Sequence, residues 1–221
     1  YGDFDGSGSR DTTGNLNNDT PSRAIYKQYA QILLPPNDFK FTIDGTDTNR
    51  IYVLNFNRAR FKEKLDPGNL EINLALLSGS QQANSENTGS NIKVDGTNRV
   101  LSLIDDSSTA PGQVGESGKI YNIVSGSIDN GTNIFNSAAP HHFGLLFPEH
   151  GIVVLDANRL DASASFGTVT GSGIQGENPM KLFKSLSGSA AVSGIPATRN
   201  FGLQARSSEQ VKSSFYFVRV K

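Results

Sequence analysis

The sequence predicts a mainly β domain, a turn-rich β-sandwich or barrel-like fold with two or three short helices and long polar loops. The longest apolar runs, residues 143–147 and 152–155, have strand length and flank a turn at residues 148–151 that contains Pro and Gly. Apolar residues also alternate with polar ones on both sides of two Asp-Gly pairs. Only 36% of residues are hydrophobic and 19% charged, and Gly, Ser, Asn and Thr fill the difference. This composition favours short strands and polar loops.

Two hairpins are predicted at the Asp-Gly pairs. Residues 39–43 alternate into Asp44-Gly45, and residues 51–56 supply the returning strand. Residues 92–94 lead into Asp95-Gly96, and residues 100–104 lead out. Asp-Gly accommodates the positive φ angles of the tight turns that join antiparallel strands.

The N-terminal half contains one predicted helix and one further strand. The helix starts at Thr20-Pro21 and ends before Pro35-Pro36, because a hydroxyl cap followed by proline begins helices and prolines end them. Its inner stripe is predicted to contain Ile25, Tyr29, Ile32 and Leu33. Apolar and polar residues partly alternate in the same segment, so a strand remains the alternative. Residues 57–65 are predicted to form one or two helical turns, and residues 70–76 an alternating strand.

The C-terminal half is expected to combine loops, strands and two helices. Residues 105–118 and 125–140 are predicted loops on either side of a short strand at 119–124, and a short helix follows residue 155. A second helix is predicted from Asn178 to Leu186, with Met180, Phe183 and Leu186 on one side and Gly188 after its end. Residues 215–220 form the most strand-like run, and we expect it to pair centrally within the domain or with a neighbouring subunit.

The chain is expected to form a flexible N-terminal arm, residues 1–19, and a single elaborated β-rich domain, residues 20–221. The arm has too few apolar residues to offset the entropy of ordering, so a neighbouring chain is expected to order it. The first residue is not Met, and the last residues end in a strand without a closing turn. We therefore expect the sequence to be part of a longer or processed chain.

Charge and cysteine content restrict the classes of partner. The net charge of −1 argues against nonspecific binding to nucleic acid or to an anionic membrane. No run approaches the roughly 20 apolar residues that span a bilayer. The absence of cysteine excludes disulfides, thiolate metal sites and thiol catalysis, and it fits assembly in a reducing cytoplasm.

Two short motifs resemble ligand-binding loops but lack their context. Residues 171–176 match G-x-G-x-x-G, yet no buried strand precedes them, and no Asp or Glu follows between Asn178 and Ser208 to hold a ribose. Residues 3–14 alternate Asp3, Asp5, Ser7 and Asp11 like a calcium loop, but Gly14 replaces the bidentate Glu. A polar loop and a solvated arm are the favoured interpretations.

The remaining candidates for chemistry are one histidine cluster and one basic run. His141, His142, Glu149 and His150 include all the histidine in the chain, but adjacent strand residues face opposite sides and Pro148 prevents an aligning helix. Arg58, Arg60, Lys62 and Lys64 are diluted by Glu63 and Asp66, which favours a solvated or salt-bridged surface. No G-x-S-x-G nucleophile elbow is present. We therefore expect no enzyme activity, no catalytic residue, no metal and no cofactor.

Four segments together resemble a known group of proteins. RAIYKQYAQILLPPNDFKFTIDG, IYVLNFNRARFKEKLDPGNLEINLALLSG, FGLLFPEHGIVVLDANRLDAS and SSFYFVRVK occur in this order over residues 20–221. The chain resembles structural virion proteins of T4-like cyanophages and related tailed phages. The resemblance implies a non-enzymatic tail, baseplate or neck subunit, present in many copies in the virion, assembled in the host cytoplasm and bound to other virion structural proteins.

The alternative function is a carbohydrate-binding or adhesin-like β module used in host attachment. For this module the rings of Tyr26, Tyr29, Tyr52 and Tyr121 are candidate stacking faces, although Trp, the best stacking residue, is absent. A hydrolase of cell-surface glycans would need two carboxylates roughly 5–10 Å apart, a pairing that sequence does not reveal.

Overall fold

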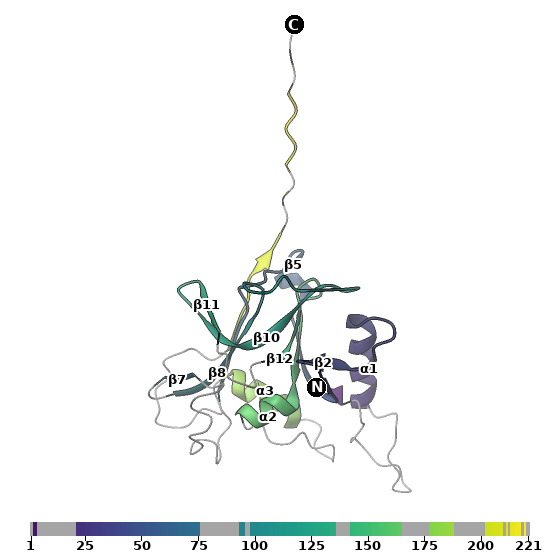
Figure 1. The fold of residues 1–221 in the computed structure, drawn as a ribbon, viewed down its shortest axis with the longest axis vertical. Coiled ribbons are helices and arrows are strands. Elements are labelled where there is room, and N and C mark those ends of the chain that lie inside the picture. Colours follow the sequence, from purple (N-terminus) through teal and green to yellow (C-terminus); the bar gives the residue numbers. More distant parts are fainter. Residues whose placement is uncertain are drawn as a thin grey trace.

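The computed structural model describes residues 2–3, 21–75, 93–95, 98–135, 142–164, 177–187, 202–209, 211, 213–217 and 219. It confirms the predicted fold class: the body is mainly β, with three short helices and a curled antiparallel sheet that forms a half-barrel (Figure 1). Residues 211–219, as far as they are described, extend away from this body in the same view.

The half-barrel is built around one continuous path of antiparallel strands. Their order is β1 (Gly2–Asp3), β4 (Arg50–Asn55), β13 (Ile152–Asp156), β12 (His142–Phe147), β10 (Gly118–Asp129), β8 (Asn98–Asp105), β6 (Glu71–Ala75) and β14 (Gly202–Gln204). Three strands branch from the path: β9 (Gln113–Gly115) and β11 (Thr132–Phe135) pair with β10, and β7 (Lys93–Asp95) pairs with β8. Two smaller sheets join β2 (Phe41–Ile43) to β3 (Thr46–Thr48) and β5 (Lys64–Leu65) to β15 (Ser207–Ser208).

The helices cover the two faces of the sheet. Helix α1 (Pro21–Leu33) packs with the β2–β3 hairpin on one core cluster, and α2 (Ala157–Ala164) and α3 (Glu177–Leu186) pack on the other. In Figure 1, α1 lies at the right of the body, and α2 and α3 lie together at its bottom. Consecutive residues of β13 contribute to different cores: Val153 and Leu155 join the cluster that includes Leu160 of α2, whereas Ile152 and Val154 join the cluster under α1. Because both faces are covered, residues 152–155 of β13 and 145–147 of β12 are apolar in succession instead of alternating with polar residues.

Successive residues of β12 also alternate between the two core clusters, and a β-bulge in this strand shifts that alternation by one residue. Ile123 pairs with Gly144 but Val124 pairs with His142, so Phe143 is the extra residue. Phe143 therefore packs in the same cluster as Leu146, three residues later.

The predicted hairpins form, with one change of partner. Asp44 and Gly45 have φ angles of 52° and 71°, as a tight hairpin turn requires, but the returning strand is β3, whereas residues 51–55 pair with β13. Strands β7 and β8 pair with Asp95 opposite Asn98; the turn residues 96–97 lie outside the described residues. The hairpin at residues 148–151 is confirmed, with Phe147 opposite Ile152, and α2 follows it directly.

The predicted loops at 105–118 and 125–140 were partly wrong. Strand β10 is twelve residues long and continues to Asp129, and it turns at Asn130-Gly131 into β11, with φ angles of 51° and 77°. At its other end it pairs with β9. An Asn-Gly hairpin was therefore overlooked, because its flanking strands are polar on the sides that remain partly exposed.

The helices form where predicted, but their buried faces differ. In α1 the buried residues are Tyr26, Ala30 and Leu33, whereas Ile25 and Ile32 are exposed. In α3, Leu182 and Ser185 are buried and Phe183 is exposed. Only a 3₁₀ turn, Arg58–Arg60, and the short strand β5 form within residues 57–65.

The C-terminal run does not pair within this chain as far as it is described. Phe215, Tyr216 and Phe217 belong to no strand, so the central pairing inside the domain is not observed for these residues, and pairing with a neighbouring subunit stays a prediction. Within the N-terminal arm, Gly2 and Asp3 pair with Ile51 and Arg50 of β4; residues 4–19 lie outside the described residues.

Candidate functional site

The sequence candidates for metal binding do not assemble into a centre as far as the structure describes them. Glu149 and His150 are exposed in the β12–β13 turn, and His142 lies in β12, where its Nδ1 is 3.5 Å from Oδ1 of Asp44. No group of three His, Asp or Glu side chains that could hold a metal ion occurs in the described part of the chain. His141, the glycine motif at 171–176 and all of the calcium-like loop except Asp3 lie outside that part.

The basic run forms local contacts with its own chain. The guanidinium of Arg58 lies 4.7 Å from the centre of the Phe61 ring and donates to the carbonyl oxygens of Glu63, at 2.9 Å, and Glu149, at 3.3 Å. Lys62 is paired with Glu209, and the hydrogen bond and charge of this carboxylate raise the pKa of the Lys62 ammonium. The run therefore anchors the β5–β15 region.

The tyrosines proposed as sugar platforms are mostly core residues. Tyr26, Tyr52 and Tyr121 are buried, and Tyr29 is partly buried. The hydroxyl of Tyr26 donates to the Thr48 carbonyl at 2.7 Å and accepts from the Phe41 amide at 3.0 Å, which fixes α1 to the β2–β3 hairpin. These three rings cannot stack on a glycan.

Three buried carboxylates were not singled out from the sequence, and each supports the fold. Asp105 accepts hydrogen bonds from the amides of Gly68 and Ser107. Asp106 accepts from the backbone and side-chain nitrogens of Asn122 at 2.9 and 2.7 Å. Asp156 accepts from the amide of Asn158 at 2.8 Å and so caps α2. Backbone donors occupy these groups, which is typical of structural carboxylates.

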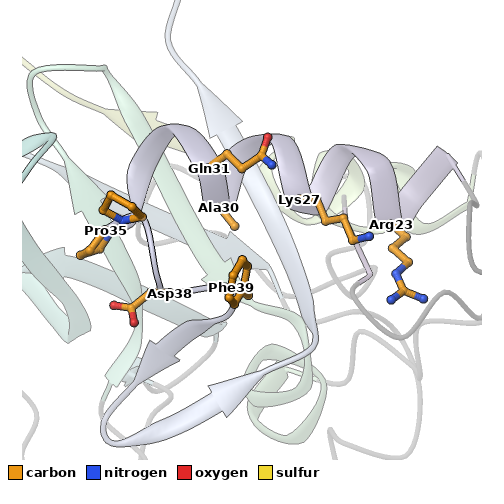
Figure 2. Close-up of a pocket in the computed structure, with 8 residues that line it drawn as sticks. Arg23, Lys27, Ala30, Gln31, Pro35, Asp38 and Phe39 are labelled. Carbon is orange, nitrogen blue, oxygen red and sulfur yellow. The ribbon is translucent and has the colours of Figure 1, made fainter.

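A pocket of about 590 Å³ lies between α1 and the segment that leads into β2. We call it the helix pocket; its lining residues are Arg23, Lys27, Ala30, Gln31, Pro35, Pro36, Asp38 and Phe39. In Figure 2 the ring of Phe39 lies beside Ala30 below α1, and Arg23 and Lys27 lie farther along the same helix. Phe39 is 67% exposed. The pocket thus offers one aromatic face beside cationic, amide and carboxylate groups.

A second hollow, of about 430 Å³, lies where the core under α1 reaches the surface. We call it the β9 groove. Its apolar lining includes Leu34, Val114, Ile120 and Leu145, and its polar lining includes Asp38, Lys40, Asp44 and His142. Ser117, in the turn between β9 and β10, donates to the Leu33 carbonyl at 2.7 Å and so ties the end of α1 to this edge.

Arg159 fixes the other rim of the β9 groove. Its guanidinium donates to the carbonyl oxygens of His142, at 2.9 Å, and Ile43, at 3.2 Å. It also lies 3.6 Å from Asp44 and 3.7 Å from Asp156. One cation thereby connects α2, β12 and the β2–β3 turn.

The third feature is the C-terminal segment, residues 211–219, which we call the tail. Phe215, Tyr216 and Phe217 are 84%, 89% and 100% exposed, and the described residues of the tail run away from the half-barrel (Figure 1). Its base is held to the body because Ser207 and Ser208 pair with β5 and the Asp66 amide donates to the Arg206 carbonyl at 2.8 Å.

Comparison with known proteins adds no relative. No protein-family model, no curated protein and no solved structure matches the chain. Within the described residues, no helix has both the length and the apolar character needed to cross a membrane. Function is therefore inferred from the sequence and from the surfaces described above.

Proposed function

We propose that this chain is a non-enzymatic structural subunit of a tailed-phage virion, in the tail, baseplate or neck, and that it acts through protein–protein assembly in many copies. The observation that carries the proposal is the tail, in which three consecutive aromatic side chains are almost fully exposed. Contiguous exposed apolar residues of this kind mark surfaces that another protein covers.

The size of the exposed aromatic surface supports assembly. An aromatic side chain buries roughly 150–250 Å² on full burial, so three of them could remove on the order of 500 Å² from water. At about 25 cal/mol per Å² this corresponds to an upper limit of roughly 12 kcal/mol, before the entropy of ordering the tail is subtracted. A contact that retains part of this free energy, repeated in many copies, is suited to a particle. The resemblance to cyanophage virion proteins narrows the proposal to this class of particle, assembled in the host cytoplasm.

A mass-spectrometric inventory of purified virions tests this proposal. We expect peptides from the chain at a fixed copy number relative to the major structural proteins, together with peptides that extend beyond either end of the present sequence if it is part of a longer one. Absence of the chain from purified particles, while it is abundant in infected-cell lysate, would refute the structural role.

A glycan-binding function in host attachment is the second candidate, and the helix pocket favours it. The exposed ring of Phe39 beside Gln31, Lys27 and Asp38 combines a stacking face with hydrogen-bonding groups, the arrangement that sugars require. A glycan array probed with the wild-type chain and with Phe39→Ser tests it. The control is Phe183→Ser, because Phe183 is an exposed aromatic residue of α3 outside the pocket. Binding that Phe39→Ser loses and Phe183→Ser retains would support this second function.

A further inference from the structure

The β9 groove is a place where the core is left partly uncovered. Ile120 and Leu145 belong to the cluster under α1 and also line the groove, so the groove floor continues the core. On its wall, Val114 of β9 is 85% exposed. Among the described strands, β9 pairs only with β10, and its outer edge therefore presents backbone groups that a further strand can use.

The tail has the alternation that such a groove would accept. In an extended segment, Phe215, Phe217 and Arg219 lie on one face, and Tyr216 and Val218 lie on the other. The first face thus presents two rings followed by one cation. Recognition by strand addition uses this division, in which backbone bonds supply affinity and alternate side chains enter pockets.

The charges of the two surfaces are complementary. Residues 210–221 contain Lys212, Arg219 and Lys221 and no acidic residue. The groove wall carries Asp38 and Asp44 beside Lys40. Asp44 already contacts Arg159, whereas Asp38 is an exposed carboxylate at the opening. Asp38 is therefore the expected partner of Arg219.

We propose that the tail of one copy of this chain pairs along β9 of a second copy, with Phe215 and Phe217 in the β9 groove and Arg219 beside Asp38. This inference rests on the proposed function only in assuming that copies assemble. The occupant is a second copy because the base of the tail is fixed at β15 and its described residues lead away from their own body (Figure 1). The tail and the groove are different surfaces, so each copy can insert its tail into one neighbour and accept the tail of another. Such a heterologous contact builds rings or filaments.

Photo-crosslinking tests the contact without assuming a register. Phe217 is replaced by p-benzoylphenylalanine, which keeps an aromatic side chain, and a 1:1 mixture of ¹⁵N-labelled and unlabelled chains is irradiated. We expect mixed-isotope crosslinks to peptides that contain Val114 or Asp38. Crosslinks confined to chains of one isotope would show that the tail contacts its own chain and would overturn the assignment to a second copy. Crosslinks to other peptides would overturn the assignment to the β9 groove.

Sedimentation equilibrium of surface variants provides an independent measurement. Val114→Lys adds a cation to the groove, and we expect it to weaken self-association at least tenfold, whereas the matched change Ile134→Lys on the exposed side of β11 leaves it unchanged. Arg219→Glu should weaken association, and Asp38→Arg should restore it in the double variant. Equal association of Val114→Lys and wild type would overturn the proposal.

The two proposals fail separately. Chains that self-associate but crosslink elsewhere remain candidates for a virion subunit with a different interface. The virion inventory decides the proposed function whatever the interface, because it detects the chain in the particle and not the contact.

Discussion

Removing the carboxylate of Asp105 should destabilise the domain more than any comparable change at an exposed acidic residue. The side chain is fully buried at the end of β8, and its two oxygens lie 2.7 and 2.9 Å from the same amide nitrogen, that of Gly68. The Ser107 amide at 3.2 Å and the Leu70 amide at 3.4 Å also donate to it. Asp105 thus holds the turn before β6 against the end of β8.

The magnitude follows from these three donors. A hydrogen bond to a charged group contributes about 1.5–3 kcal/mol, and a buried donor left without a partner costs about 1–3 kcal/mol. Counting Gly68 as one strong bond and the other two as weak, we expect Asp105→Ala to lower the free energy of unfolding by about 3–5 kcal/mol. Asp105→Asn keeps one acceptor oxygen and should cost about 1–2 kcal/mol.

Urea unfolding followed by circular dichroism measures these changes. Asp47→Ala is the matched control, because Asp47 is exposed and accepts one hydrogen bond from Thr42, at 2.8 Å; its effect should stay within about 0.5 kcal/mol. A loss below about 1 kcal/mol for Asp105→Ala, at an unchanged slope with urea, would refute the assignment of Asp105 as the support of this turn.

Three further changes test other parts of the fold. Gly144→Ala should abolish soluble expression or lower the melting temperature strongly, because a Cβ there would overlap the Val154 carbonyl oxygen in the paired strand; wild-type melting would contradict the register between β12 and β13. Gly131→Ala should cost only about 1 kcal/mol in urea unfolding, because its φ is 77° but its Cβ position is open; a much larger loss would indicate contacts at this turn. Lys62→Met should melt at a lower temperature than wild type below pH 10.5, and this difference should shrink as the pH rises through the raised pKa of Lys62. Above that pKa the Lys62 amine is neutral and its charge no longer pairs with Glu209. A difference that grows at high pH would show that the pair does not stabilise the fold in this way.

Local patterns in the sequence were sufficient for the class of fold and for several turns. The Asp44-Gly45 and 148–151 turns, the strands beside the latter, and helix α1 depend on interactions between near neighbours, which composition and spacing express directly. The side of α1 that is buried was not evident from spacing. Tyr26 is central because its hydroxyl meets Thr48 and Phe41, residues whose positions are set by the hairpin.

The candidate surfaces were less accessible to sequence reasoning. The β9 groove combines residues of the segment after α1 and of β2, β9, β10 and β12, and no spacing along the chain indicates that Asp38 and Val114 share one hollow. Likewise, Asp105 and Asp106 are adjacent acidic residues with different partners. Asp105 accepts from the amide of Leu70, 35 residues before it, and Asp106 accepts from Asn122, 16 residues after it.

What the sequence by itself determined is the β-rich class, several of the turn positions and the apolar, cationic character of residues 215–221, because these follow from residue type and short-range periodicity. Only the tertiary structure decided that residues 51–55 pair with β13 instead of with the nearer strand, that the tyrosines are buried, and that Phe215 to Phe217 lie outside the sheet. The physical reason is that strand partners and burial depend on which distant surfaces compete for the same apolar face. A strand-like sequence specifies the ability to pair, and the rest of the fold selects the partner.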